Sequence, residues 1–130
     1  MESILIVDDD VKLCDVLSEE LSEIGYMTNK VYNAEDALKL LLSGTPIDLI
    51  LLDLKMPGKD GFYVLQMLKK MNLNVKVIVL TAYADVKSAI DSAKMGANDF
   101  ISKPYDLDEL LITIRKVLQK ESADSGIRED

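Results

Sequence analysis

The fold of this 130-residue chain is best understood from one run of residues, Leu49-Ile50-Leu51-Leu52-Asp53-Leu54-Lys55-Met56-Pro57-Gly58-Lys59-Asp60-Gly61. Its first four residues are large and apolar, which predicts a strand buried on both faces, as in a parallel sheet. Asp53 ends the apolar run, and a proline and two glycines then turn the chain away. An acid at the carboxyl end of a central parallel strand lies where open α/β sheets place their ligand sites. An ordinary turn residue would explain Asp53 alone equally well.

The same kind of pattern continues along the rest of the chain. Apolar strands are predicted at residues 4–7, 26–32, 49–52, 75–80 and 99–102, and a segment with helical periodicity follows each of them. Strands that alternate with helices in this way indicate βα units. The sequence therefore predicts an α/β domain with a five-stranded parallel sheet, in which 26–32, the most polar strand, lies at an edge.

Two features of the predicted helices matter for the site. Asp10 is expected to be the N-cap of the first helix, and Asp106 the N-cap of the last. The fourth helix, at about 85–95, has only a weak apolar stripe, and we expect it to dock shallowly on the sheet. That stripe consists of Val86, Ala89, Ile90 and Ala93.

Composition excludes several classes of protein. The net charge of −8 argues against direct nucleic-acid binding, and no stretch is apolar enough to span a membrane. The chain has no histidine, which removes histidine-based triads and metal sites. Its single cysteine favours a cytoplasmic location. We expect residues 1–120 to form one domain and the polar residues 121–130 a tail or the start of a linker.

Polar residues follow four of the predicted strands. Right-handed crossovers bring these strand ends to one edge of the sheet. Several carboxylates meeting there would repel one another unless a cation lies between them. Oxygen ligands without histidine or cysteine favour a hard ion, and Mg²⁺ suits carboxylates, water and phosphate. The residues concerned are Asp8, Asp9, Asp10, Asp53, Thr81 and Lys103.

The residues on the other strands also have ordinary structural interpretations. Thr81 could simply bond within a turn, and Lys103 could be a solvated surface lysine. If the groups do converge, however, Asp53 can act as a nucleophile that takes a phosphoryl group as an acyl phosphate. Lys103 and Thr81 then offer a positive charge and a hydroxyl donor to the phosphoryl oxygens.

Four motifs, in order and at these spacings, make the sequence resemble a response-regulator receiver domain of the CheY-like superfamily over roughly residues 3 to 120. This resemblance implies a doubly wound, flavodoxin-like fold with strand order 2-1-3-4-5. The motifs are Ile4-Leu5-Ile6-Val7-Asp8-Asp9-Asp10, Leu51-Leu52-Asp53-Leu54-Lys55-Met56-Pro57-Gly58, Leu80-Thr81-Ala82 and Lys103-Pro104-Tyr105.

By this resemblance Asp53 is the phosphoacceptor and also a metal ligand. Asp8 and Asp9 hold Mg²⁺ directly or through water, and the backbone carbonyl of Lys55 completes the protein ligands. Mn²⁺ can substitute for Mg²⁺ at a site of this kind.

The resemblance also implies a switch. Thr81, the backbone of Ala82 and Lys103 bind the phosphoryl oxygens, and the peptide bond before Pro104 is expected to be cis. Phe100 occupies the aromatic switch position. Phosphorylation would move the Thr81 loop inward and let Phe100 follow, which changes the surface of the fourth helix, fifth strand and fifth helix.

Partners are implied in the same way. The phosphoryl donor would be a phosphohistidine on a sensor histidine kinase or a phosphotransfer protein. The output would be an effector domain or a separate protein, and a phosphorylation-dependent dimer is also among the implied assemblies. The run from Thr81 to Leu110 is similar to receivers of the NtrC type, whose effector is an ATPase that activates transcription.

Lys55 and Tyr83 lie two residues beyond Asp53 and Thr81 and flank the path of an attacking water. We expect them to shield the acyl phosphate and to tune dephosphorylation, unless both side chains simply lie on the surface.

Two alternative functions remain open from the sequence. Asp8-x-Asp10 after an apolar strand resembles the first motif of haloacid-dehalogenase-type phosphatases, with Asp8 as the nucleophile. That interpretation leaves Asp53 unexplained, and the chain lacks a cap domain. A protein-binding module that is never phosphorylated is the other alternative.

Overall fold

The computed structural model describes residues 1–129, with side chains described as far as Gln119. Five parallel strands form one sheet in the order β2-β1-β3-β4-β5, which confirms the predicted fold class and strand order. The strands are β1 (Ser3–Val7), β2 (Met27–Val31), β3 (Leu49–Leu52), β4 (Lys76–Thr81) and β5 (Asp99–Ser102). The helices are α1 (Val11–Ile24), α2 (Ala34–Leu42), α3 (Gly61–Lys70), α4 (Val86–Lys94) and α5 (Leu107–Glu129).

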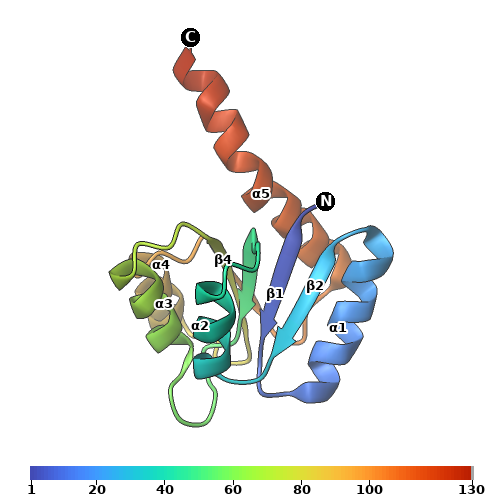
Figure 1. The fold of residues 1–130 in the computed structure, drawn as a ribbon, viewed down its shortest axis with the longest axis vertical. Helices are drawn as coiled ribbons and strands as arrows, with labels where there is room; N and C mark the ends of the chain where they lie inside the picture. Colours follow the sequence, from blue (N-terminus) through green and yellow to red (C-terminus); the bar gives the residue numbers. More distant parts are fainter. Residues whose placement is uncertain (130) are drawn as a thin grey trace.

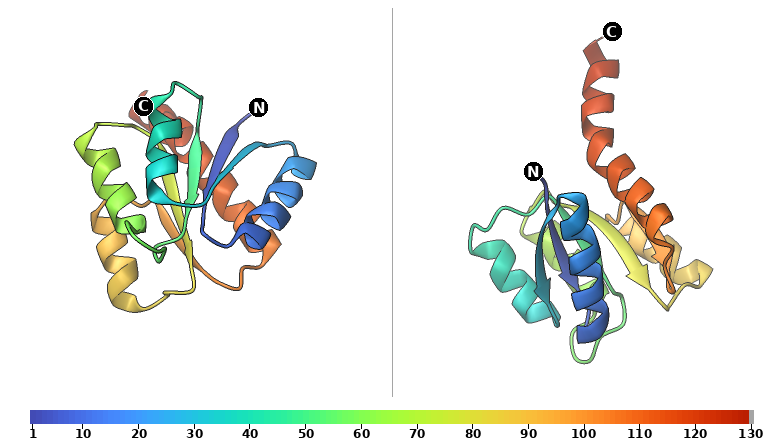
Figure 2. Two further views of the ribbon diagram at one scale, coloured as in Figure 1. Left: turned by 60° about the horizontal axis from the view of Figure 1, so that its bottom comes forward. Right: turned by 90° about the vertical axis from the view of Figure 1, so that its right-hand side faces the viewer.

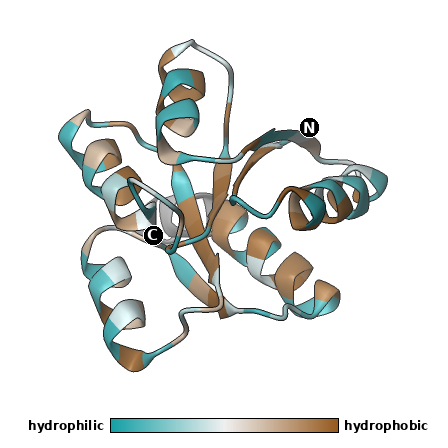
Figure 3. Cartoon of the chain, turned by 90° about the horizontal axis from the view of Figure 1, so that it is seen from below, coloured by the Kyte–Doolittle hydropathy of each residue, from teal (hydrophilic) through white to brown (hydrophobic). Residues whose placement is uncertain are grey.

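The helices form a layer on each face of the sheet (Figures 1 and 2). Alternate residues of β3 supply the two faces: Leu49 and Leu51 pack in a core with α1 and α5, and Ile50 and Leu52 in a core with α2 and α3. Figure 3 shows the apolar strands in the centre, with the helices around them. The continuous apolar run therefore predicted correctly a strand that is buried on both sides.

Aspartates cap four of the five helices and fix where they begin. Asp10 accepts a hydrogen bond from the backbone N–H of Leu13, and Asp106 from that of Glu109, as the sequence predicted. Asp60 and Asp85 cap α3 and α4 in the same way. Each cap satisfies a helical N–H that has no partner within the helix.

The prediction that α4 docks through its apolar stripe is wrong. Val86 is 75% exposed and Ile90 49% exposed, whereas the residue of this helix that is buried is Ser92. The hydroxyl of Ser92 donates to the carbonyl of Ala89, which lets a polar residue face the sheet without an unmet hydrogen bond. The helix therefore turns its larger apolar residues toward solvent.

The last helix continues into the residues expected to form a tail or linker. It ends at Glu129 and extends past the sheet (Figure 1). Residues 121–129 contain no proline that would stop a helix. The division into a domain over 1–120 and a tail or linker over 121–130 stays a prediction, and Asp130 lies outside the described residues. Within those residues, no helix has both the length and the apolar character that crossing a membrane requires.

Candidate functional site

The sheet register brings the ends of β1 and β3 level with each other, and β4 continues past them to Thr81. Val7 is paired with Leu52, and Leu52 with Val79. Backbone hydrogen bonds continue the ladder into the loops: the N–H of Asp53 donates to the carbonyl of Val7 over 3.0 Å, and that of Lys103 to the carbonyl of Thr81 over 2.9 Å. The site residues therefore start from a rigid platform.

Three carboxylates meet at this edge of the sheet. One ligand oxygen from each of Asp8, Asp9 and Asp53 lies within 4.8 Å of the other two. Asp8 is 3% exposed and Asp53 is 6% exposed, whereas Asp9 is open to solvent. Asp10, the fourth acid considered, serves as the helix cap and is not part of this group.

Lys103 provides a positive charge to two of these acids. Its Nζ lies 2.7 Å from Oδ2 of Asp8 and 3.5 Å from Oδ2 of Asp53. It is therefore not a solvated surface lysine. Burial tends to lower the pKa of Lys103, but the hydrogen bond that its ammonium donates to Asp8 and the charges of both acids outweigh burial, so the pKa is raised. Burial raises the pKa of Asp8 in spite of this lysine, because Asp8 is the more deeply buried of the two.

The donor set suits a hard divalent cation. Counted at their formal charges, three carboxylates and one ammonium carry two net negative charges, which one divalent ion would neutralise. Asp8 and Asp53 each accept a backbone N–H at Oδ1, from Asp10 over 2.9 Å and from Lys55 over 3.3 Å, so both carboxylates are oriented. The exposed Asp9 leaves the group open to solvent, which matches the several waters that Mg²⁺ keeps.

The Thr81 hydroxyl is fully buried and is held within its own turn. It accepts the backbone N–H of Tyr83 over 3.1 Å. In the described part of the chain, no hydrogen bond joins Thr81 to Asp53. Phe100 is half-buried against the core on the α2 and α3 face, beside Val79 of β4. Thr81 and Phe100 therefore lie on neighbouring strands, β4 and β5.

Lys55 and Tyr83 contact each other, which the sequence did not predict. The Lys55 ammonium donates a hydrogen bond to the Tyr83 hydroxyl and lies 4.3 Å from the centre of its ring. This contact links the β3–α3 loop to the β4–α4 loop. Both residues line a pocket of about 290 Å³ that extends to Phe62 and Ser88.

A second contact across the site was also missed. The Lys103–Pro104 peptide bond is cis, and the next residue, Tyr105, donates from its hydroxyl to Oε1 of Glu20 on α1. Burial and the neighbouring Glu20 together raise the pKa of Tyr105. Glu20 lies 85 residues earlier in the chain, so no local pattern could have indicated this pair.

Gly61 is a third residue whose role was missed. A Cβ atom at this position would lie 2.4 Å from the carbonyl oxygen of Asp53 and 2.8 Å from Cα of Leu54. The N–H of Gly61 also donates to the carbonyl of Leu54 over 2.9 Å. The only sequence signal was a glycine at a helix start, directly after a capping aspartate.

Comparison with known proteins gives a consistent result. The family described as response regulator receiver domain matches residues 4–115. Sporulation initiation phosphotransferase F of Bacillus subtilis is 37% identical over 121 residues, which cover 93% of this chain and 97% of that protein. The DNA-binding transcriptional regulator NtrC of Proteus hauseri is 34% identical over 116 residues, or 89% of this chain and 24% of NtrC.

The solved structures agree. The response regulator protein TrrA of Thermotoga maritima, in complex with Mg²⁺ and BeF, is 38% identical with a TM-score of 0.80, and the match covers 90% of this chain and 99% of TrrA. This chain thus spans nearly all of some relatives and about a quarter of NtrC. The predicted similarity to NtrC-type receivers is confirmed for that quarter.

Proposed function

Because this chain belongs to the family of response regulator receiver domains, which are phosphoacceptor switches rather than enzymes in the usual sense, we propose that Asp53 accepts its phosphoryl group. One observation carries the proposal: the buried Asp53 carboxylate lies beside Asp8, Asp9 and the Lys103 ammonium. Family membership also removes the reason to consider the phosphatase alternative with Asp8 as the nucleophile. Both oxygens of Asp8 already accept hydrogen bonds.

The proposed phosphoryl transfer forms one P–O bond and breaks one P–N bond. An oxygen of Asp53 supplies the electron pair for a new P–O bond, while the P–N bond of a phosphohistidine breaks and its pair stays on the imidazole nitrogen. Bound Mg²⁺ would supply positive charge that draws the phosphoryl oxygens and the carboxylates together. Asp8, Asp9, Asp53 and the Lys55 carbonyl would hold it. Lys103 would turn from Asp53 toward a phosphoryl oxygen, which needs only a small movement from its present 3.5 Å.

The proposed switch uses Thr81 and Phe100. Thr81 accepts one hydrogen bond at its hydroxyl oxygen, so its hydroxyl proton is available for a phosphoryl oxygen. The backbone N–H of Ala82 would bind the same group. Movement of this loop would make room for Phe100, which borders the core and carries no hydroxyl, so its effect on the α4, β5 and α5 surface would be through packing alone. The phosphoryl group has to favour one pre-existing packing by only a few kcal/mol.

The proposed partners follow from the reaction. The donor is a phosphohistidine on a sensor histidine kinase or a phosphotransfer protein, since this chain has no histidine of its own. The receiver of the signal is an effector domain or a separate protein, and a phosphorylation-dependent dimer is one form that the output can take. The cytoplasmic location and the absence of nucleic-acid contacts by this domain stay predictions from composition.

Lys55 and Tyr83 are proposed to slow the loss of the phosphoryl group. Their mutual contact keeps a long aliphatic stem and an aromatic ring together in the loops that flank Asp53. Replacing both with alanine should shorten the lifetime of the acyl phosphate by roughly tenfold, an effect on the barrier of about 1.4 kcal/mol. Decay of radiolabelled protein after removal of the donor measures it. The exposed Lys12 and Tyr32 provide a control pair, and equal decay in both double variants would contradict the proposal.

The proposed function is tested with radiolabelled acetyl phosphate and Mg²⁺. The unaltered chain should take up label at Asp53, Asp53→Asn should take up none, and the exposed control Asp108→Asn should behave normally. Chelation with EDTA should abolish uptake. Label that persists in Asp53→Asn, or that maps to Asp8, would overturn the assignment. Lack of uptake by the unaltered chain would favour a module that is never phosphorylated.

A further inference from the structure

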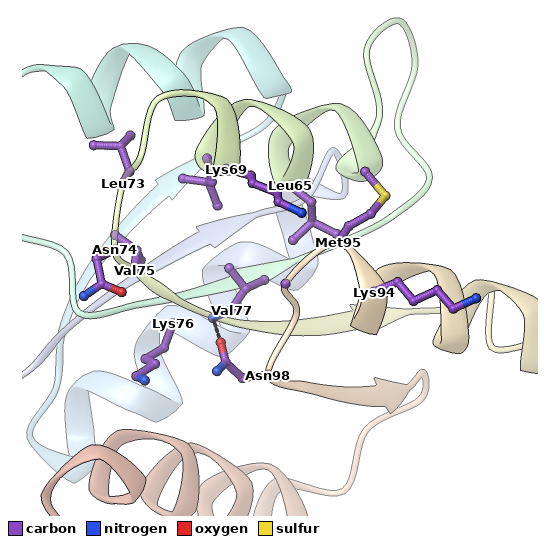
Figure 4. Close-up of a pocket in the computed structure, with 12 residues that line it drawn as sticks. Leu65, Lys69, Leu73, Asn74, Val75, Lys76, Val77, Lys94, Met95 and Asn98 are labelled. Atoms are coloured by element: carbon purple, nitrogen blue, oxygen red, sulfur yellow. Dashed lines mark hydrogen bonds between the residues drawn. The ribbon is translucent and has the colours of Figure 1, made fainter. Parts of the chain in front are cut away.

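A second hollow lies at the opposite edge of the sheet from Asp53. It has a volume of about 300 Å³ and is enclosed by the end of α3, the start of β4 and the segment that follows α4 (Figure 4). No part of the proposed phosphoryl-transfer chemistry uses it. Its walls are built from residues 65–77 and 94–98, so it lies where the chain enters β4 and β5 rather than where it leaves them.

The floor of this hollow is apolar and rigid. Leu65, Leu68 and Val77 are each at most 5% exposed and belong to the core, and Met95 closes one side. Asn98 fixes the position of the wall, because its Oδ1 accepts the N–H of Val77 over 2.8 Å while its own N–H donates to the Val77 carbonyl over 2.7 Å. An apolar group that entered here would meet a preformed surface.

The rim of the same hollow is positively charged. Lys69, Lys76 and Lys94 are among its twelve lining residues, and none of the twelve is acidic, although the chain as a whole carries a net charge of −8. None of the ion pairs in the described part of the chain involves these lysines. In Figure 4, Lys69 lies near Leu65 and Met95, and Lys76 and Lys94 extend on either side. Like charges that gather around a concavity focus a positive potential there.

We propose that this hollow binds a small amphipathic anion, with an apolar body on the Leu65, Leu68 and Val77 floor and a carboxylate or phosphate head among the lysines. Its volume is that of about ten water molecules at ~30 Å³ each, which corresponds to a ligand of roughly ten non-hydrogen atoms. Lysine ammonium groups bind such heads as mobile point charges. The ligand would touch Met95 and Gly96, directly after α4.

A free small molecule explains these features better than a membrane or a peptide. The net charge of −8 repels an anionic bilayer, and three lysines do not offset it. The hollow holds only about ten atoms. An acidic peptide would require further contacts on the surrounding surface.

Octanoate is a suitable probe, since it has ten non-hydrogen atoms and one carboxylate. Titration in the presence of EDTA, followed by backbone amide shifts, should move residues 65–77 and 94–98 selectively. Octylammonium carries the wrong charge and acetate lacks the apolar body, so neither should reproduce the shifts.

The matched variants are Lys69→Gln/Lys94→Gln and the control Lys12→Gln/Lys39→Gln. All four lysines are exposed and both variants lose two positive charges, so the total charge is the same. The first pair should weaken octanoate binding by about tenfold and the control by less than about twofold. A normal urea-unfolding midpoint in each variant shows that folding is intact.

Equal weakening in both pairs would overturn the proposal, as would shifts that lie elsewhere or that octylammonium also produces. Sedimentation with phosphatidylglycerol vesicles would assign the surface to a membrane instead. Binding of the peptide Asp-Glu-Leu-Phe-Asp-Glu without binding of octanoate would assign it to a protein partner. Neither result would affect the proposed function of Asp53, which acetyl phosphate tests separately.

Discussion

The ammonium group of Lys103 has two functions, of which the second is proposed. In the absence of a phosphoryl group its ammonium compensates the buried Asp8 and Asp53 carboxylates, at 2.7 and 3.5 Å. Once a phosphoryl group arrives, the same charge is proposed to bind it. The site is therefore held together by a contact that has to rearrange, and its stability should depend on which cations are present.

Lys103→Met tests this dependence. The variant keeps an apolar stem but leaves two buried carboxylates without their partner, so we expect the free energy of unfolding to fall by about 3 kcal/mol in EDTA. Mg²⁺ should then stabilise the variant more than the unaltered chain, because the ion replaces the missing charge. Urea unfolding with and without Mg²⁺ measures both effects, and Lys12→Met is the control. An unfolding free energy that is unchanged in EDTA would contradict the role of Lys103.

Cys14 makes stability depend on pH in the alkaline range. Its side chain is fully buried, and burial raises the pKa of the thiol from 9.0 to about 12. Between about pH 9 and pH 12 the folded state therefore keeps a thiol proton that the unfolded state loses. The thiol has no effect on the unfolding free energy below pH 9, and it lowers that free energy as the pH rises from about 9 to 12.

The expected loss of unfolding free energy follows from the pKa shift of the Cys14 thiol. Between pH 8 and pH 10, the unaltered chain should lose about 1.4 kcal/mol more of its unfolding free energy than Cys14→Ala, because one pKa unit corresponds to about 1.4 kcal/mol. Only the change in unfolding free energy with pH is compared between the two proteins. The cavity left by Cys14→Ala lowers stability equally at every pH, so it cancels in this comparison. Lysines and tyrosines titrate in both proteins alike. Parallel pH profiles in urea unfolding would show that the thiol does not contribute.

The contact of α3 with the end of β3 depends on one glycine. Gly61 allows the first turn of α3 to lie directly against the backbone of Asp53 and Leu54. Because these are backbone atoms, they cannot move aside as the end of a flexible side chain could. The start of this helix and the position of the phosphoacceptor are thus one structural unit.

Gly61→Ala should destabilise the fold by about 3 kcal/mol, at the upper end of ordinary overpacking, and should also slow labelling by acetyl phosphate. Gly44→Ala is the matched control: its φ of 87° is strained for alanine, but a Cβ there meets nothing within 4 Å. We expect about 1 kcal/mol of destabilisation and normal labelling for the control. Thermal unfolding and the labelling rate distinguish them, and equal behaviour would refute the close-contact argument.

Helix α4 buries little apolar side-chain area. Its larger apolar residues, Val86 and Ile90, face solvent, and Ser92 is the residue that the sheet buries. Little apolar area therefore holds this helix in place, so its displacement has a low free-energy cost. This is the physical basis for expecting α4 to respond when the nearby Thr81 loop moves.

The whole molecule is expected to respond along one side only. Beryllofluoride with Mg²⁺, which mimics a phosphoryl group on Asp53, should shift backbone amides throughout 84–105 in the unaltered chain. In Thr81→Ala the shifts near Asp53 should remain, while those in 84–105 should fall by roughly half or more, since the coupling runs through the hydroxyl. Heteronuclear NMR measures both sets. Shifts in the unaltered chain that spare 84–105 would refute the proposed route.

Much of the fold and of the candidate site could be predicted from the order of residues alone. The run Leu49–Leu52 predicted a strand buried on both faces, and Asp10 and Asp106 predicted helix starts, because burial and capping depend on neighbours that are close in the chain. The gathering of Asp8, Asp53 and Lys103 also followed, because parallel strands joined by right-handed crossovers present their carboxyl ends at one edge.

Other features depended on the tertiary structure. The pairing of Lys55 with Tyr83 and of Tyr105 with Glu20, and the lysine-rimmed hollow at the far edge of the sheet, join residues that no local pattern connects. The apolar stripe predicted to dock α4 on the sheet was wrong, since periodicity identifies apolar residues on one side of a helix but not what lies opposite that side. Periodicity and residue type act over a few residues of chain, whereas such contacts depend on how separate elements pack against one another in space.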